Sequence, residues 1–170
     1  DKQTLYNAIK YAYDKGVIII AAVGNDGDST NYYPASYDEV MGVGSVGLDK
    51  SLSYFSQTND SVDVVAPGEK VKSLLNEDEY VELEGTSQAA AYVTGVIATL
   101  LSANDLFTEE VKEMIAQTSE DLGTSGKDNL YGYGLIDANQ LFIETIKSTS
   151  YYLSPINDNT ILIYNNTDKP

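Results

Sequence analysis

The sequence predicts an α/β fold with a mostly parallel sheet. A helical pattern near the N-terminus leads directly into the apolar run Val17–Val23, which is half of an α/β repeat. Two more apolar runs follow at Val40–Val46 and Val62–Ala66. Continuous apolar runs of this kind are typical of parallel strands covered on both faces. The segment after Ser87 is apolar all round its predicted helix, and we expect such a helix to be buried.

The first helix has a clear face and a clear end. Gly16 stands where the helix should stop, directly before the first strand. The apolar side chains on one helical face are Leu5, Ala8, Ile9 and Ala12. The third strand should stop at Pro67-Gly68. A short strand pair, Lys70–Leu75 with Glu79–Glu84, is expected around the polar turn at residues 76–78.

Two further helices have predicted caps. We expect Thr108 to cap a helix whose first turn carries Glu109 and Glu110, as the helix dipole favours. Asp137 is expected to cap a second helix, with Gln140 three residues later. Between these helices the glycine-rich segment Gly126–Gly134 is predicted to cross the surface.

The character of the chain changes after residue 147. The runs Tyr151–Leu153 and Ile161–Tyr164 are short and β-like, and Pro155 and an Asn/Asp cluster separate them. We therefore assign residues 1–147 to one domain. Residues 148–170 are interpreted as a linker or the start of a following β-rich module.

The composition argues against several kinds of partner and site. Ten basic residues stand against 26 acidic ones, a net charge of −16, which disfavours nucleic acid and anionic membrane surfaces. The absence of cysteine excludes a disulfide framework and a cysteine-based metal site. No segment approaches the roughly 20 apolar residues of a membrane-spanning helix.

The tripeptide Gly85-Thr86-Ser87 stands where the apolar helix must begin. First-turn N–H groups lack intrahelical partners, and the helix dipole is positive at that end. A serine hydroxyl there suits a nucleophile that attacks where negative charge develops. The alternative is an ordinary N-cap, in which Ser87 accepts a bond from a helix amide.

Asn25 ends the first predicted strand, in the segment Ala21–Asn25. Ligand sites in open α/β sheets lie beyond the carboxyl ends of the strands. The Asn25 carboxamide could therefore donate its NH₂ group to an oxyanion. It could equally initiate the turn at residues 25–27.

Taken together, these segments resemble the subtilisin-like serine protease family, the subtilases. The matching landmarks occur in the family's order: Ala21–Asn25, Tyr33-Pro34-Ala35, Val43–Val46, Phe55-Ser56, Val65–Gly68, Gly85–Gly95 and Gly132–Ala138. The resemblance implies a three-layer, doubly wound, mostly parallel sheet, present here as the C-terminal portion of the catalytic domain.

The resemblance also assigns roles to residues. It makes Ser87 the nucleophile and Asn25 the side-chain donor to the oxyanion, with the Ser87 backbone N–H as a second donor. The implied substrate-binding residues are Ala22, Val23, Gly24, Gly85 and Thr86. No cofactor and no catalytic metal are implied, although a structural calcium or sodium ion is allowed on carbonyls near Ala35, Tyr37 and Val40. The Tyr33–Pro34 bond is expected to be cis.

The family's catalytic Asp and His precede the matched segments, and this chain contains no histidine. We therefore expect a missing N-terminal half of the domain, or a partner chain, to supply the histidine, and we expect this chain alone to be inactive. Without that half, Val17–Val23 or a neighbouring strand should form an unpaired edge. The isolated chain should then be marginally stable or self-associated.

The predicted function is hydrolysis of polypeptides by an Asp-His-Ser triad in an extracellular or cell-surface bacterial enzyme. The first alternative is a pseudoprotease that kept the fold as a binding or regulatory module. The second is a non-enzymatic α/β ligand-binding domain, in which the matching landmarks are accidental.

Overall fold

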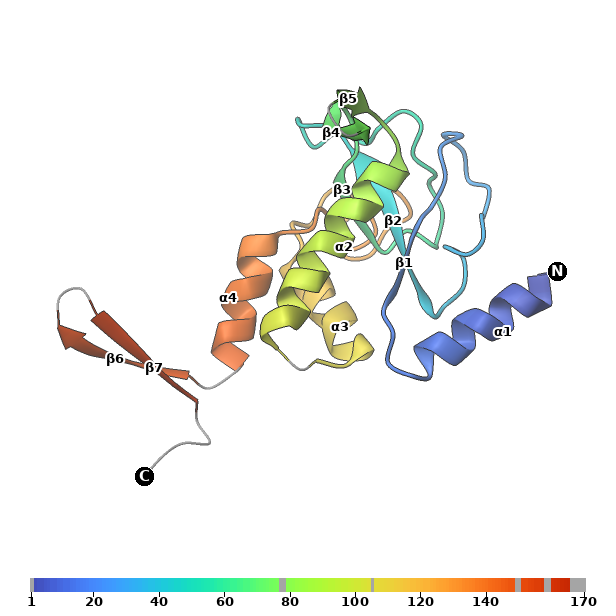
Figure 1. Cartoon of the computed structure of the whole chain (residues 1–170). Helices are drawn as coiled ribbons and strands as arrows, with labels where there is room; N and C mark the ends of the chain where they lie inside the picture. The colour runs from blue at the N-terminus through green and yellow to red at the C-terminus, as the bar shows by residue number, and fades with distance from the viewer. Residues whose placement is uncertain (1, 77–78, 105, 149–150, 158–159, 166–170) are drawn as a thin grey trace.

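The computed structural model describes residues 2–76, 79–104, 106–148, 151–157 and 160–165 (Figure 1). Its centre is a three-stranded parallel sheet in the order β1-β2-β3. The strands are β1 (Ile19–Ala22), β2 (Val40–Val46) and β3 (Val64–Pro67). In the register of the sheet, Ile19 lies opposite Val40 and Val43 lies opposite Val64. The predicted parallel α/β class is confirmed.

Helices cover one face of this sheet. Helix α2 (Thr86–Ala103) runs across all three strands (Figure 1), and α3 (Thr108–Thr118) and α4 (Ala138–Ser148) pack beside it. One stripe of α2 meets the inward side chains of β2 and β3. The buried core on this side comprises Met41, Val43, Val64, Ala66, Ala89, Val93, Ile97, Leu100, Val111, Ile115 and Leu141.

Loops cover the opposite face. The connections between adjacent strands, residues 23–39 and 47–63, contain no helix, although both are described throughout. They supply part of a second, smaller core, which comprises Val23, Ala35, Val46, Val62 and Val65. Leu122, Tyr131 and Leu135 pack against it from the segment between α3 and α4. The strands therefore alternate their side chains between a helical layer and a loop layer.

The N-terminal helix and first strand are less buried than the sequence pattern predicts. Helix α1 (Lys2–Tyr13) is followed by Gly16 with φ +80°, as expected, and it buries Ile9. Leu5 on the same face is 43% exposed. Strand β1 is only half-buried, and β2 is the only strand paired with it in the described residues. The unpaired edge that we expected is therefore β1 itself, and this strand is not covered on both faces.

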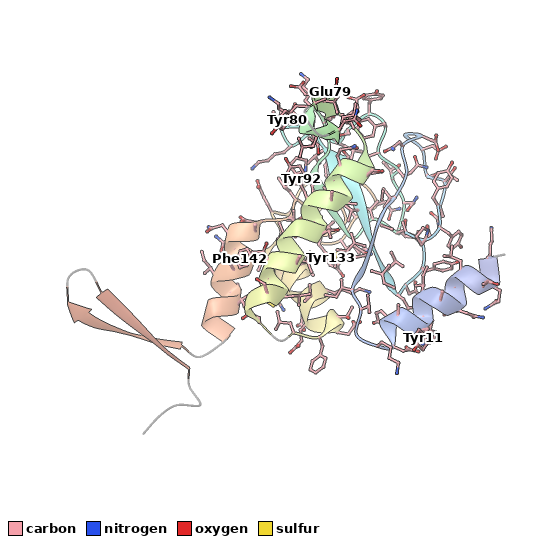
Figure 2. The ribbon with its side chains drawn as sticks, viewed as in Figure 1. Tyr11, Glu79, Tyr80, Tyr92, Tyr133 and Phe142 are labelled. Atoms are coloured by element: carbon pink, nitrogen blue, oxygen red, sulfur yellow. The ribbon has the colours of Figure 1, made fainter. Side chains whose placement is uncertain are left out.

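The prediction that α2 is buried all round is wrong for the part of the chain that the structure describes. The side of α2 turned away from the sheet carries exposed small and aromatic residues: Ala91, Tyr92, Gly95 and Ala98. We call these four residues the outer face of α2. Tyr92 is 48% exposed there (Figure 2). An apolar helix face without cover is unusual for a helix that crosses the centre of a sheet.

A short antiparallel hairpin stands next to the start of α2. It consists of β4 (Val71–Asn76) and β5 (Glu79–Leu83), which confirms the predicted strand pair. The predicted turn residues 77 and 78 lie outside the described residues. Most side chains of the hairpin are exposed, and Glu79 and Tyr80 mark its outer end in Figure 2.

One of the two predicted helix caps is confirmed. The Asp137 carboxylate accepts a 3.0 Å hydrogen bond from the Gln140 N–H at the start of α4. At α3 the N-cap residue is Phe107, so the prediction for Thr108 is wrong. There the Glu110 carboxylate reaches back and accepts the Phe107 N–H at 2.8 Å. Thr108 is buried one position inside the helix, and its hydroxyl has no partner among the described residues.

The segment Gly126–Gly134 is tied to the body of the protein, because the Tyr133 N–H donates to Asp63 O at 2.8 Å and Gly134 O accepts the Val65 N–H at 3.0 Å. The Asp128 carboxylate accepts bonds from the N–H groups of Thr124, Leu130 and Tyr131. Burial raises the pKa of Asp128, but these backbone donors outweigh it and the net pKa is lowered. Gly132 and Gly134 are buried beneath this turn.

A second antiparallel hairpin lies at the C-terminal end. Strands β6 (Tyr151–Asn157) and β7 (Thr160–Asn165) contain the two β-like runs that the sequence indicated. In Figure 1 this hairpin extends away from α4. The division of the chain at residues 147 and 148 stays a prediction. None of the helices in the described residues has the length and apolarity that crossing a bilayer requires.

Candidate active site

Ser87 lies in the first turn of α2, at the carboxyl end of the parallel strands. The N-cap residue is Gly85, with φ +151° and ψ +160° and no side-chain capping bond. Ser87 is the second residue of the helix and is exposed, and its hydroxyl has no hydrogen-bond partner among the described residues. The alternative that Ser87 is an N-cap is therefore wrong. The serine sits at the positive end of the helix dipole with its hydroxyl available.

The Asn25 side chain is bonded to the residue that precedes Ser87. Asn25 Oδ1 accepts the Thr86 N–H at 2.8 Å and the Thr86 hydroxyl at 2.9 Å. These bonds join segments 61 residues apart. The carboxamide therefore does not serve the local turn, which was the alternative that the residues left open.

The same bonds orient the donor end of Asn25. Because both Thr86 groups are donors, the carboxamide must present its oxygen to them, which leaves Nδ2 directed elsewhere. A Cβ placed on Gly85 would lie 3.4 Å from this Nδ2 atom. The Asn25 NH₂ group is thus beside the Gly85-Thr86-Ser87 turn, and it has no partner among the residues described. A free NH₂ donor beside the turn that carries an exposed serine is an arrangement that can stabilise an oxyanion.

The predicted substrate-binding residues differ in whether their side chains or only their backbone groups can contact a bound peptide. The side chains of Val23 and Thr86 are completely buried, so only their backbone groups can reach a bound peptide. The Thr86 hydroxyl lies 3.3 Å from Gly24 N and 3.2 Å from Gly24 O. Thr86 therefore braces Asn25 and Gly24. Of the others, Gly85 is buried, and Ala22 and Gly24 are half-buried.

The turn at Gly85 also packs on the end of β3. The Gly85 N–H donates to Gly68 O at 2.8 Å. A Cβ on Gly68 would come within 2.7 Å of Gly85 O and 2.3 Å of the Ser45 hydroxyl oxygen. Gly68 leaves no room for a side chain, so the start of α2 packs on the end of β3 through close backbone contact.

Sequence reasoning missed Gln57, which organises the loop after Asn25. Gln57 is completely buried, and its side chain bonds to residues 26, 28 and 30. The Thr30 N–H and the Gln57 NH₂ group both donate to Asp28, and they lower the pKa of that carboxyl. A lone glutamine in a polar loop carries no sequence signal for burial, since glutamine is mostly exposed in proteins.

A groove of about 670 Å³ adjoins Ser87. It lies between the outer face of α2, the β4–β5 hairpin and Phe142 of α4; Figure 2 labels Phe142, Tyr92 and Tyr80 along this side. Leu74 and Leu83 of the hairpin contribute apolar surface, and Gln88 and Thr99 contribute polar groups.

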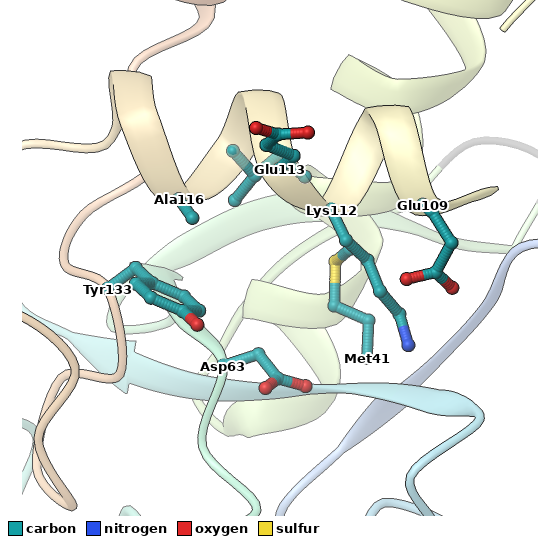
Figure 3. A pocket seen from close by; sticks show the side chains of 8 residues that line it. Met41, Asp63, Glu109, Lys112, Glu113, Ala116 and Tyr133 are labelled. Atoms are coloured by element: carbon teal, nitrogen blue, oxygen red, sulfur yellow. The ribbon is translucent and has the colours of Figure 1, made fainter. Parts of the chain in front are cut away.

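A second hollow, of about 410 Å³, lies at the other end of the sheet (Figure 3). Met41 near the start of β2 and Asp63 just before β3 form its floor, and Glu109, Lys112 and Glu113 of α3 line its wall. The Tyr13 hydroxyl donates to Glu109 beside it, and this bond raises the pKa of Tyr13 to about 12. Neither Ser87 nor Asn25 lines this hollow.

The residues expected to hold a structural cation share a small polar hollow of about 240 Å³. Ala35, Tyr37 and Val40 line it together with Asp38 and other acidic residues, and oxygen donors of this kind suit sodium or calcium. Lys127 also lines it and already bonds to Asp63 at 2.8 Å. The Tyr33–Pro34 bond is cis, as expected. No cluster of three or more metal-ligating side chains occurs in the described part of the chain, and the bound cation stays a prediction.

Comparison with known proteins finds relatives of one kind. The model of the subtilase family matches residues 1–134. A thermophilic serine proteinase of Bacillus sp. (strain AK1) is 39% identical over 135 residues, which are 79% of this chain and 33% of the relative. The major intracellular serine protease of Bacillus subtilis (strain 168) is 43% identical over 107 residues, which are 60% of this chain and 34% of the relative. Other relatives are named as extracellular proteases.

Comparison with solved structures also finds a protease. The solved structure of the prenylagaramide maturation protease PagA matches with a TM-score of 0.73 and 26% identity, over 82% of this chain and 54% of that one. The chain thus spans between about a third and a half of the length of these relatives. Because the family model covers most of the sequence, this chain belongs to the subtilase family.

Proposed function

We propose that the full-length protein is a serine endopeptidase and that this chain supplies its nucleophile and its oxyanion-binding asparagine. The observation that carries the proposal is the pair of bonds from Thr86 to Asn25 Oδ1, at 2.8 and 2.9 Å. They hold a carboxamide donor beside the residue that precedes an exposed serine. Membership of a family whose named relatives are proteases supports the same conclusion.

The proposed reaction begins when the Ser87 hydroxyl attacks the carbonyl carbon of a peptide bond. A base removes the hydroxyl proton as the new C–O bond forms, and negative charge moves to the carbonyl oxygen. Asn25 Nδ2 and the Ser87 backbone N–H donate to that oxygen, at the positive end of the α2 dipole. The base then protonates the leaving amine, and water releases the peptide acid from the acyl-enzyme.

The base must come from outside this chain, because the chain contains no histidine. We propose that residues of the full-length protein that precede this chain supply the catalytic Asp and His. The half-buried edge of β1 and the outer face of α2 are the surfaces that such a segment would cover, since both are apolar and lack partners in the described residues. The 170-residue chain by itself should lack proteolytic activity.

We further propose a polypeptide substrate, no required cofactor, and a weak sodium or calcium site near Ala35, Tyr37 and Val40. An extracellular or cell-surface bacterial location is also proposed. Two relatives are named as extracellular proteases, which supports this location, and a third is named as intracellular.

The proposal is tested by peptide hydrolysis with the full-length protein, its Ser87→Ala variant and the 170-residue chain. We expect turnover by the full-length protein, a loss of about 10⁴- to 10⁶-fold in kcat for Ser87→Ala, and no turnover by the chain alone. Robust hydrolysis by the chain alone would show that its serine needs no external histidine.

If the full-length protein binds peptides but does not cleave them, the protein is a pseudoprotease. The intact Ser87 and Asn25 favour the active enzyme, because a protein that only binds has no chemical need for an available hydroxyl beside an oriented NH₂ donor.

A further inference from the structure

Gln57 forms a buried anchor under the loop that carries Asn25. Its side-chain oxygen accepts the N–H groups of Asp26 and Asp28, both at 3.1 Å. Its NH₂ group donates to Asp28 Oδ1 at 2.6 Å and to Thr30 O at 3.1 Å. The side chain is completely buried, so every donor and acceptor of the carboxamide is satisfied by this one loop.

These bonds hold the backbone on both sides of Asn25. Before it, Gly24 O accepts the Gln57 backbone N–H at 3.3 Å, and a Cβ on Gly24 would lie 2.8 Å from Gln57 Cγ. After it, the Asp26 N–H points at the Gln57 oxygen. Asn25 itself is not among the residues to which the Gln57 side chain bonds. Gln57 therefore holds the two neighbours of Asn25, Gly24 and Asp26, and leaves the Asn25 side chain to its contacts with Thr86.

Two independent restraints thus act on the Asn25 carboxamide. Thr86 fixes the oxygen end of the side chain, and Gln57 fixes the backbone from which the side chain extends. An oxyanion donor must lie within about 3 Å of where the charge develops, and misplacement by about 1 Å can cost on the order of 100-fold in rate. A restraint on the backbone of Asn25 therefore has a direct effect on catalysis.

We propose that Gln57 is the positioning residue for the oxyanion donor Asn25. The inference rests on the proposed protease function, and it goes beyond it by adding a residue that never touches the substrate. Its role is to hold the Asn25 backbone in register with Ser87 while peptide binds and charge develops.

Asn59 provides a matched control within the same loop. It is also a buried carboxamide, and its NH₂ group donates at 2.9 Å to Thr30 O, the acceptor that Gln57 shares. Its oxygen accepts from the Ser61 N–H and hydroxyl, two residues further along its own loop. A purely structural role for buried carboxamides predicts similar consequences at the two positions, whereas positioning of Asn25 predicts a difference.

The experiment compares Gln57→Met and Asn59→Leu in the full-length protein, because both changes keep the approximate volume and remove the polar bonds. We expect both to lower the melting temperature. Gln57→Met should lower kcat by about 10- to 100-fold with KM changed less than about threefold, whereas Asn59→Leu should change kcat less than about threefold. Equal effects of the two variants on kcat would overturn the inference.

A double-mutant cycle gives the second readout. In an Asn25→Ala background no carboxamide remains to be positioned, so adding Gln57→Met should cost less than about threefold more in kcat. Full additivity would overturn the inference while leaving the proposed function intact. If the wild-type protein has no activity, the proposed function fails instead.

If Gln57→Met does not fold, amide hydrogen exchange in the wild-type protein provides the test. Slow exchange at the Asp26 and Asp28 N–H groups supports their bonds to the Gln57 side chain, and fast exchange contradicts them.

Discussion

The two ends of the parallel sheet differ in the features usually used to find active sites. The amino end has a hollow of about 410 Å³ lined by Asp63, Glu109 and Glu113, and a tyrosine whose pKa is raised to about 12. The carboxyl end has an exposed serine and an oriented carboxamide. Carboxylates therefore gather in a hollow at one end of the sheet, whereas an exposed serine and an oriented NH₂ donor lie at the other end, where the larger groove adjoins Ser87.

The difference follows from what each end contains. A catalytic cleft needs walls, and the surfaces beside Ser87, the outer face of α2 and the β4–β5 hairpin, are open in this chain. The hollow at the amino end lies between α3, the segment carrying Tyr133 and the starts of β2 and β3 (Figure 3). In a part of a domain, preorganised donors are a better guide to chemistry than a hollow lined by carboxylates.

The largest expected effect separates the two ends directly. Asn25→Asp keeps an oxygen that accepts both Thr86 bonds, but it removes the NH₂ donor and adds negative charge beside the developing oxyanion. We expect kcat of the full-length protein to fall at least 10²- to 10³-fold, the range known for subtilisin itself, with little loss of thermal stability. Glu113→Gln at the amino-end hollow should leave kcat within about twofold. A large effect of Glu113→Gln on kcat would instead place the active site at the amino end of the sheet and contradict the proposal.

A smaller effect is expected from closing the space beside Asn25. In Gly85→Ala the new Cβ would lie 2.8 Å from Gln88 Oε1 and 3.4 Å from Asn25 Nδ2, at a φ of +151°. We expect about a 10-fold loss of kcat together with about 1–3 kcal/mol of stability. The control is Gly126→Ala, where φ is +85° and nothing lies within 4 Å. It should cost about 1 kcal/mol of stability and no activity, as measured by thermal unfolding and peptide hydrolysis.

The loop that carries Asn25 should depend on pH in the acidic range. The Thr30 N–H and Gln57 bonds lower the pKa of Asp28, so its contribution to stability is complete above the ordinary value of about 3.9. It is lost as pH falls through the lower folded value. Amide exchange at Thr30 should accelerate in that window, and Asp28→Asn should remove the step. A folded-state pKa at or above the ordinary value, measured by NMR titration, would contradict the described contacts.

The smallest effect concerns the amino end. The bond to Glu109 raises the pKa of Tyr13 to about 12, so its contribution is present below the ordinary value of about 10 and lost as pH rises through about 12. Glu109→Gln should return the phenol titration toward the ordinary value without changing peptide hydrolysis. Glu113→Gln on the same helix should leave the Tyr13 titration unchanged, and an equal shift in both variants would assign it to general charge.

The sequence pattern predicted the strands well because a strand that is buried on both faces appears as an unbroken run of apolar residues. Val40–Val46 is a strand with the predicted bounds, and the β4–β5 pair lies where the polar turn indicated. The all-round burial of α2 failed for a different reason. Its apolar residues require a cover, and the sequence pattern does not reveal that the described residues cover only one side.

The site was partly predictable. Ser87 and Asn25 became candidates because small-residue and strand-end segments resemble known landmarks, and the structure joins the two segments through the bond from Thr86 to Asn25. Their catalytic roles stay predictions. The buried state of Thr86 and Val23 could not be predicted, because a substrate-binding segment mixes residues that face the ligand with residues that brace them. Gln57 was missed because its partners lie 27 to 31 residues away and no local pattern marks them.

The central claim is that the Ser87 hydroxyl and the Asn25 NH₂ group act on one carbonyl group, the hydroxyl on its carbon and the NH₂ group on its oxygen. Its most direct test is covalent labelling of the full-length protein with an organophosphonate, whose phosphoryl oxygen takes the place of the oxyanion, followed by mapping of the modified residue. The account predicts a single adduct on Ser87, none in Ser87→Ala, and about 10²-fold slower labelling in Asn25→Asp. Modification of another residue, or labelling of Ser87 at an unchanged rate in Asn25→Asp, would contradict it.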